Sequence, residues 1–169
     1  ALHEQATSDG LDLLSDSQIA GLVEVRPGEM WVATLSQGLV AVDFTRGETR
    51  RIRHVPAWPM SLADNALRAL YRDRAGLVWV ATNRGLSRHD PRQDAVLTRF
   101  GLTPDGGDAL DARFVSTEIS WIQPMPDGRL WLGTHKSGVD ILDAGGARVG
   151  ALRPDRSRPL TALPPDIVL

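Results

Sequence analysis

The apolar residues of this chain fall into short runs, and residues that favour turns separate these runs. Several runs come in pairs joined by a turn, for example residues 30–34 and 39–44, and residues 77–82 and 86–90. Glycine, proline, asparagine and aspartate lie between the runs at regular intervals. This spacing is typical of an all-β fold and argues against alternating strands and helices. The pattern therefore predicts a chain built from short strands joined by hairpins.

The same arrangement of apolar and polar positions occurs three times, and each copy is centred on a tryptophan. A glycine lies three residues before the tryptophan, and a threonine lies three residues after it. These repeat positions are Gly28, Trp31, Thr34, Gly76, Trp79, Thr82, Gly128, Trp131 and Thr134. The tryptophans are spaced by 48 and 52 residues, a period in the range of β-propeller blades. We interpret the tryptophans as fillers of the core between blades and the glycines as turn residues.

The repeat predicts an all-β chain that forms a β-propeller fragment of about three four-stranded blades. We expect the blades at residues 17–54, 65–100 and 117–152, and the start of a further blade at residues 157–169. Closed propellers contain about 4–8 blades, so residues 1–169 as a whole are interpreted as a partial β-propeller.

The ends of a three-bladed array lack the neighbouring blades that cover apolar sheet faces inside a propeller. Residues 2–6 are expected to form the outer strand of a preceding blade. The uncovered faces predict self-association, and two copies facing each other would close a six-bladed ring as a dimer.

Composition narrows the range of partners and sites. The formal net charge is -2 over 169 residues, so we expect no nucleic-acid partner and no attraction to an acidic membrane surface. No stretch approaches the ~20 apolar residues of a membrane span, so no membrane contact by this segment is expected. The chain has no cysteine, and its four histidines lack the spacing of metal ligands. Familiar catalytic motifs are absent too, so we expect no metal, no cofactor and no catalytic residue.

Residues 73–86 read DRAGLVWVATNRGL and match every position of the pattern D-x-x-G-x-x-W-x-x-T-x(2,3)-G-L. The other two copies depart at the aspartate, where they carry Val25 and Met125, and the third copy has Val139 in place of the leucine. Over roughly residues 9–169 the chain resembles the two-component regulator propeller repeat. Proteins with this repeat are similar to periplasmic sensor regions of hybrid histidine kinases and diguanylate cyclases. In them a β-sandwich, a membrane helix and a cytoplasmic output domain follow the propeller.

The resemblance implies a periplasmic sensory module that binds a small molecule or a glycan and has no catalysis of its own. A histidine kinase or diguanylate cyclase output domain would belong to the rest of a full-length protein. Two other classes stay open. A propeller hydrolase or lyase acting at the central channel would bring histidine, aspartate or glutamate there, whereas glycine, alanine, serine, arginine and tryptophan occupy the expected channel positions. A scaffold that only binds other proteins is also compatible with the sequence.

Candidate ligand-binding residues lie where the three copies differ, because the shared positions have structural explanations. Ten residues before the tryptophan the third copy carries Trp121 where the others have glycine and alanine, so Trp121 is a candidate stacking surface. One position earlier in the second copy, Arg68 is a candidate for binding an anion. Arg84 and Lys136 lie in the turns after the threonine, which cluster on one face of a propeller. A local packing change at Trp121 and plain solvation of the basic side chains are the alternatives.

Overall fold

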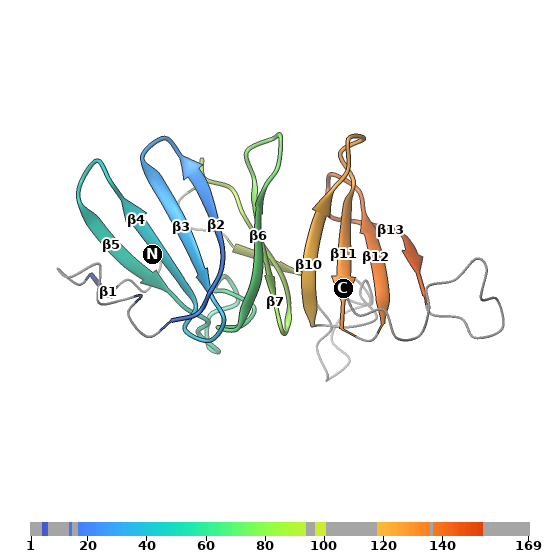
Figure 1. The fold of residues 1–169 in the computed structure, drawn as a ribbon, viewed down its shortest axis with the longest axis horizontal. Helices are drawn as coiled ribbons and strands as arrows, with labels where there is room; N and C mark the ends of the chain where they lie inside the picture. Colours follow the sequence, from blue (N-terminus) through green and yellow to red (C-terminus); the bar gives the residue numbers. More distant parts are fainter. Residues whose placement is uncertain are drawn as a thin grey trace.

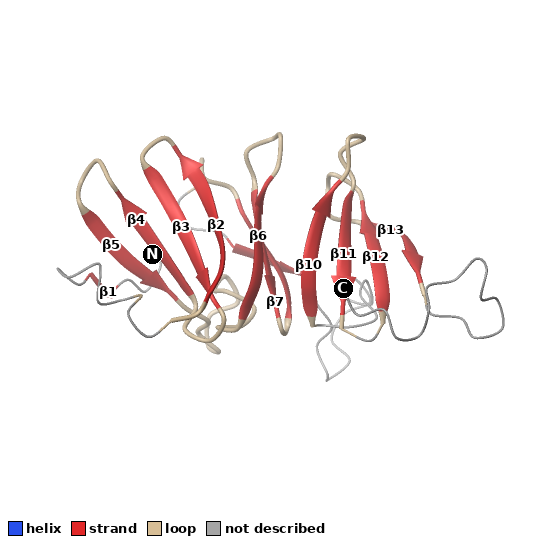
Figure 2. Cartoon of the chain, viewed as in Figure 1, coloured by secondary structure: helices blue, strands red, loops and turns tan. Residues whose placement is uncertain are grey.

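The computed structural model describes residues 5–6, 14, 17–93, 97–100, 118–135 and 137–153. Within these ranges every regular element is a β-strand, and the strands form three antiparallel sheets that lie side by side (Figure 1 and Figure 2). The prediction of an all-β propeller fragment is therefore confirmed. The described part of the chain contains no membrane-spanning helix. The expected start of a further blade at residues 157–169 lies outside the described residues.

Each sheet is a meander in which successive strands are neighbours, and we call the sheets the first, second and third blades. The first contains β2 (Ile19–Arg26), β3 (Glu29–Thr34), β4 (Leu39–Asp43) and β5 (Glu48–Ile52). The second contains β6 (Leu67–Arg72), β7 (Val78–Thr82), β8 (Gly85–His89) and β9 (Leu97–Phe100). The third contains β10 (Ile119–Pro124), β11 (Leu130–Thr134), β12 (Gly138–Leu142) and β13 (Arg148–Leu152). Because β2 and β10 both contact β6, these three first strands form the inner side of the array.

The N-terminal strand differs from the expectation. β1 (Gln5–Ala6) pairs antiparallel with β5, and Gln5 lies opposite Arg51 while Ala6 lies opposite Arg50. This strand is therefore a fifth strand on the outer edge of the first blade, and its assignment to a preceding blade is wrong. The physical reason is that β5 is an outer strand, whose backbone groups can pair with any nearby extended segment.

The repeated threonines close the hairpin that follows each tryptophan strand. Thr34 Oγ1 donates to the Gly38 carbonyl oxygen at 2.6 Å, and the equivalent bonds of Thr82 and Thr134 are both 2.7 Å long. Gly38 has a φ of 83°, and a Cβ atom there would lie 2.6 Å from the Ile52 carbonyl oxygen. Only glycine meets both conditions without strain, which explains the glycine in this turn.

Two tryptophans lie buried between successive blades. Trp31 packs in one cluster with Leu67 of the second blade, and Trp79 packs in another with Ile119 of the third. Trp31 also stacks on His89 of the second blade, with the ring centroids 4.8 Å apart. Because each buried indole removes a large apolar area from water, these contacts hold neighbouring blades together.

A β-bulge occurs at the same point in the first strand of each blade. In β6 the pairing with β7 passes from Leu67 directly to Ala69, which leaves Arg68 as the extra residue. The equivalent extra residues are Ala20 in β2 and Ser120 in β10. A bulge bends its strand and redirects a side chain. This repeated irregularity therefore decides where the Arg68 side chain points.

Candidate ligand-binding site on the connector face

One face of the array carries the segments that join blades and the turns that follow the threonines. We call it the connector face, and its best-described parts are residues 35–38, 53–66 and 83–84. It forms the lower edge of the view in Figure 1. Two predicted ligand residues, Arg68 and Arg84, lie on this face because β6 begins there and β7 ends there.

Arg68 links the second and third blades. Its Nε donates to Oδ1 of Asn83 at 2.7 Å, and its Nη2 lies 3.9 Å from Oε1 of Glu118, the residue before β10. Both partners of the ion pair are partly exposed, and such surface pairs contribute roughly 0–1 kcal/mol. An anionic ligand can therefore compete with Glu118 for the guanidinium. We call this junction of Arg68, Asn83, Arg84 and Glu118 the seam.

Arg84 extends into solvent from the turn that also supplies Asn83. Its Nε lies 3.9 Å from Oδ2 of Asp64 in the connector, and its backbone N–H donates to Thr82 Oγ1 at 3.1 Å. The backbone of the turn is thus fixed, while the arginine side chain is exposed. Because Asn83 binds Arg68, the two arginines flank the same turn.

Trp121 is a surface residue of the third blade. It is 55% exposed and lies on β10 opposite Gly133 of β11. A Cβ atom on Gly133 would lie 3.2 Å from the Trp121 Cβ, so the glycine makes room for the indole. Trp121 follows Glu118 of the seam by three residues on the same segment. The equivalent residues Gly21 and Ala69 face the blade that follows theirs, so the exposed Trp121 ring lies on the side of the third blade that faces away from the second blade.

The fourth predicted ligand residue, Lys136, lies outside the described residues. The sequence alone also does not single out the polar residues that bind the predicted arginines, which are Asp64, Asn83 and Glu118. Asn83 could have been found from the sequence by pairing the two strands of the second copy as a hairpin. Leu67 then lies opposite Thr82, and Arg68 lies next to Asn83. Asp64 and Glu118 lie in connectors, whose paths do not follow from strand periodicity. In the described ranges, no group of three or more histidines or acidic residues could hold a metal ion.

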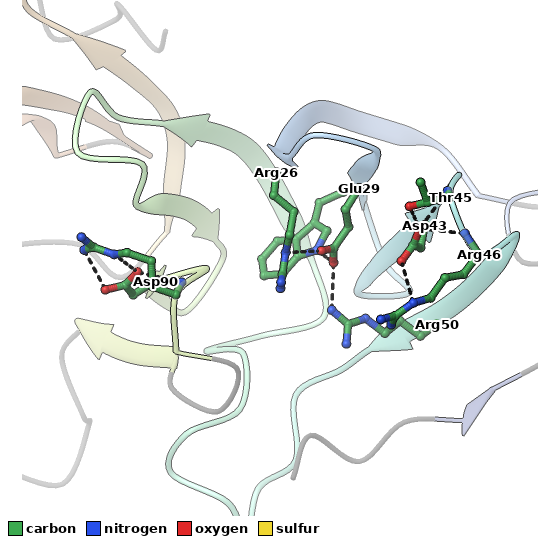
Figure 3. Close-up of polar contacts among 9 residues, drawn as sticks. Arg26, Glu29, Asp43, Thr45, Arg46, Arg50 and Asp90 are labelled. Atoms are coloured by element: carbon green, nitrogen blue, oxygen red, sulfur yellow. Dashed lines mark hydrogen bonds and ion pairs between the residues drawn. The ribbon is translucent and has the colours of Figure 1, made fainter.

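The opposite face of the array carries charged groups that stabilise their own turns (Figure 3). The Thr45 hydroxyl donates to Asp43 Oδ1 at 2.6 Å, and this bond, followed by the bond from the Arg46 N–H, holds the pKa of Asp43 below its usual value. The side chain of Arg92 likewise lowers the pKa of Asp90. Each of these carboxylates is satisfied by residues two or three positions away, so we interpret them as parts of turns and not as a ligand site.

Three consecutive meanders, packed on one another through their tryptophan strands and carrying the same bulge, define the chain as a segment of a β-propeller. Residues 61–84 match the family model described as two component regulator propeller, which confirms the resemblance for the second copy. The matched segment includes Asp64, Arg68, Asn83 and Arg84, and therefore most of the polar residues of the seam. No curated protein matches the chain.

Several solved structures share the fold. The chain is similar to the extracellular domain of BT3049 from B. thetaiotaomicron, assigned to a hybrid two component system, with a TM-score of 0.66 and 18% identity over 85% of this chain. The extracellular domain of BT4673 from the same organism gives a TM-score of 0.65 and 16% identity over 94%. A virginiamycin B lyase from Staphylococcus aureus gives 0.58 and 14% over 90%. The chain spans 20%, 22% and 46% of these three proteins, and identities this low show the fold alone.

Proposed function

We propose that this chain is part of the extracytoplasmic sensory propeller of a two-component or related signal-transduction protein. The match of residues 61–84 to the two component regulator propeller supports this proposal, as does the likeness to extracellular domains of hybrid two component systems. In this proposal the segment binds a ligand and does not catalyse a reaction. A kinase or cyclase output domain would belong to the rest of the protein, on the other side of a membrane.

The observation that carries the proposal is the seam, where the extra residue of the bulge is a charged side chain in one blade only. The extra residue of the bulge is Ala20 in the first blade, Arg68 in the second and Ser120 in the third. The strand pairing around the bulge forms equally well with alanine at this position. The charge of Arg68 is therefore not needed for the blade, and we assign it to ligand binding.

The side chain of Arg68 defines the class of ligand. The guanidinium of Arg68 suits a carboxylate or a phosphate, because it presents several N–H donors in one plane. Trp121 lies on the other side of the third blade and is therefore left out of this site. A small anionic molecule or an acidic glycan carries such a carboxylate or phosphate group. Arg84, on the same face, adds positive charge that attracts such a ligand.

The acidic residues of this region are placed for pairing with arginines. Asp64 and Glu118 each lie 3.9 Å from an arginine nitrogen. His54, in the connector after the first blade, has its Nδ1 2.6 Å from the Leu62 carbonyl oxygen, so that nitrogen is engaged with the backbone. A general acid or base needs an unengaged group within reach of the substrate. We therefore assign binding without catalysis to the described residues.

The binding site is tested by titrating the chain with glucuronate, an acidic sugar, in a calorimeter, with glucose as the neutral control. We expect saturable heat of binding with glucuronate that is lost in Arg68→Gln and is retained in Trp121→Ala, which changes the other side of the third blade. Arg92→Gln removes an arginine from the opposite face and should leave the response intact. A response that survives Arg68→Gln, or one that is lost in Trp121→Ala, would place the binding elsewhere.

The sensory role is tested separately on the full-length gene product. We expect a membrane helix and an output domain beyond this segment, and an output activity that changes when Arg68→Gln is introduced into the full-length protein. A gene product that has neither a membrane helix nor an output domain would overturn the sensory role, whatever the isolated segment binds.

A further inference from the structure

The residue before the first strand of each blade has the same backbone role. Its carbonyl oxygen accepts a bond from the N–H of the residue that follows the repeated threonine. The three pairs are Gln18 with Leu35, Ala66 with Asn83, and Glu118 with His135, at 2.9, 3.1 and 2.9 Å. The side chain at this position is uncharged in the first two blades and is a glutamate in the third. The entry into a blade therefore forms without the carboxylate of Glu118.

Arg68 and Glu118 bring opposite charges to one interface between blades. At the interface of the first and second blades, the extra residue of the bulge is Ala20 and the residue before the next blade is Ala66. At the interface of the second and third blades, these positions hold Arg68 and Glu118, whose Nη2 and Oε1 atoms lie 3.9 Å apart. An apolar cluster packs at both interfaces. The ion pair is therefore an addition to one interface and not a requirement for packing two blades.

The geometry of this ion pair suits its displacement by a ligand. The side chains of Arg68 and Glu118 are 34% and 39% exposed, and exposed pairs add little to stability. The two blades are held together by buried residues such as Trp79 and Ile119. The guanidinium is also held from another side, because Arg68 Nε donates to Asn83 Oδ1 at 2.7 Å. An anion can therefore replace the Glu118 carboxylate at Arg68 without moving either blade.

We infer that Glu118 is an internal competitor for the ligand of the seam and that it sets how tightly the seam binds an anion. This inference rests on the proposed function, because it concerns the same site. In the ligand-free chain the carboxylate of Glu118 occupies Arg68, and a carboxylate or phosphate of the ligand takes its place. The backbone of Glu118 stays bonded to His135, so only the side chain has to turn away.

The competition has two measurable consequences. Only chains in which Arg68 is not paired with Glu118 bind the anion, so the observed dissociation constant is the intrinsic one divided by the fraction of such chains. For an exposed ion pair this factor is about 2- to 5-fold. Salt weakens the pair with Glu118 as well as the contact with the ligand, so added salt changes the affinity of the unsubstituted chain little.

The competition is tested by calorimetric titration of the unsubstituted chain and two variants with glucuronate. Glu118→Gln should lower the dissociation constant by about 2- to 5-fold, and its affinity should fall more steeply as sodium chloride is added. Glu24→Gln is the matched control, because Glu24 is exposed near the end of β2, away from the connector face. It removes the same charge and should change neither the affinity nor its dependence on salt.

The titrations separate a failure of the competition from a failure of the seam as a binding site. If the unsubstituted chain binds glucuronate, but Glu118→Gln binds it no more tightly than Glu24→Gln does, the competition is overturned and the proposed function stands. If neither the unsubstituted chain nor Glu118→Gln binds glucuronate, the seam is overturned as a binding site and the competition with it. Binding by Glu118→Gln alone would support the competition in its strongest form.

The ion pair is also tested in the absence of ligand. The NMR signal of the Arg68 Nε–H should shift in Glu118→Gln and stay in place in Glu24→Gln. A signal that does not move in Glu118→Gln overturns the pairing on which the competition depends. A pair that served only to join the blades would give a different result, because Glu118→Gln would then lower the free energy of unfolding and leave the affinity for glucuronate unchanged.

Discussion

The second and third blades contain the same turn and the same tryptophan, but the indole has different surroundings in each. In the second blade Asp73 accepts a bond from the Leu77 N–H at 2.9 Å through Oδ1 and one from Trp79 Nε1 at 2.8 Å through Oδ2. In the third blade Met125 holds the equivalent position, and no described residue accepts a bond from Trp131 Nε1. Asp73 therefore links the turn of the second blade to the buried indole, and the third blade has no such link among the described residues.

The backbone of the two turns is nevertheless the same. The Asp73 N–H donates to the Leu77 carbonyl oxygen at 2.9 Å, and the Met125 N–H donates to the Arg129 carbonyl oxygen at 2.9 Å. In both turns the glycine N–H donates back to the first residue at 3.0 Å. The turn thus forms without the aspartate. The comparison teaches that the aspartate of this repeat serves the core between blades as well as the turn.

The first blade supplies the acceptor from another position (Figure 3). Val25 stands where the aspartate would be, and Glu29 accepts a bond from Trp31 Nε1 at 3.1 Å. Glu29 also pairs with Arg26 at 2.7 Å and with Arg50 at 2.8 Å. A buried carboxylate is tolerated only with such partners. Two different residues therefore perform the same task for the indoles that lie between blades.

The largest expected effect is on the free energy of unfolding, which should fall more when Trp79 is removed from between two blades than when the partly buried Trp131 is removed. Trp79→Ala leaves a cavity in the core between the second and third blades and is expected to lower the free energy of unfolding by about 3–5 kcal/mol. Trp131→Ala removes a partly exposed ring and should lower it by roughly half as much or less. Chemical denaturation at high dilution, where self-association does not contribute, measures both. Equal losses would mean that the two rings are equally well covered.

Removing the aspartate should have the next largest effect. Asp73→Ala leaves the buried Nε1 of Trp79 without its acceptor and is expected to lower the free energy of unfolding by about 1–3 kcal/mol. Asp127→Ala is the control, because Asp127 is an exposed aspartate of the third blade's turn that pairs with the adjacent Arg129. Its loss should change stability little. Urea denaturation measures the loss of unfolding free energy in both variants. Equal losses would show that Asp73 acts only within its turn.

The fold class is predictable from the sequence because each blade is a local unit. Strands pair with their neighbours in the chain, so apolar periodicity and turn residues are enough to place them. The pairing of β1 with β5 is not predictable in this way, because a two-residue strand has no periodicity. Such a strand pairs with whichever strand edge has unpaired backbone groups nearby.

The candidate site is only partly predictable. Differences between copies single out Arg68 and Trp121 as candidates, because the other two blades form without an arginine or a tryptophan at these positions. The contact between Arg68 and Glu118 depends on the path of a connector, which no residue pattern describes. The sequence shows that Met125 replaces the aspartate of the repeat. The effect of this replacement on Trp131 becomes clear only from the hydrogen bond between Asp73 and Trp79 in the second blade.

Supplying the missing acceptor should make the third blade more like the second. Met125→Asp puts a carboxylate on a turn whose backbone already has the required hydrogen bonds, so one bond to Trp131 Nε1 becomes available. The free energy of unfolding is expected to rise by about 0.5–1.5 kcal/mol, the net value of one hydrogen bond. Met125→Leu offers no acceptor and is the control. Denaturation curves and the NMR shift of the Trp131 indole N–H check the result, and a Met125→Asp chain less stable than Met125→Leu would contradict it.

The smallest effect is expected at Asp43 on the opposite face, because this carboxylate binds only residues of its own turn. The bonds from the Thr45 hydroxyl and then the Arg46 N–H lower the pKa of Asp43 in the folded chain from its ordinary value of 3.8. The folded state is therefore favoured while Asp43 is ionised, and this contribution is lost as the pH falls through the lowered pKa. Asp43→Asn should be slightly less stable than the unsubstituted chain near neutral pH and equal to it in strong acid. Since all other carboxylates are common to both chains, the difference between their urea midpoints isolates Asp43. A difference that persists in strong acid would show that the side chain acts through packing and not through its charge.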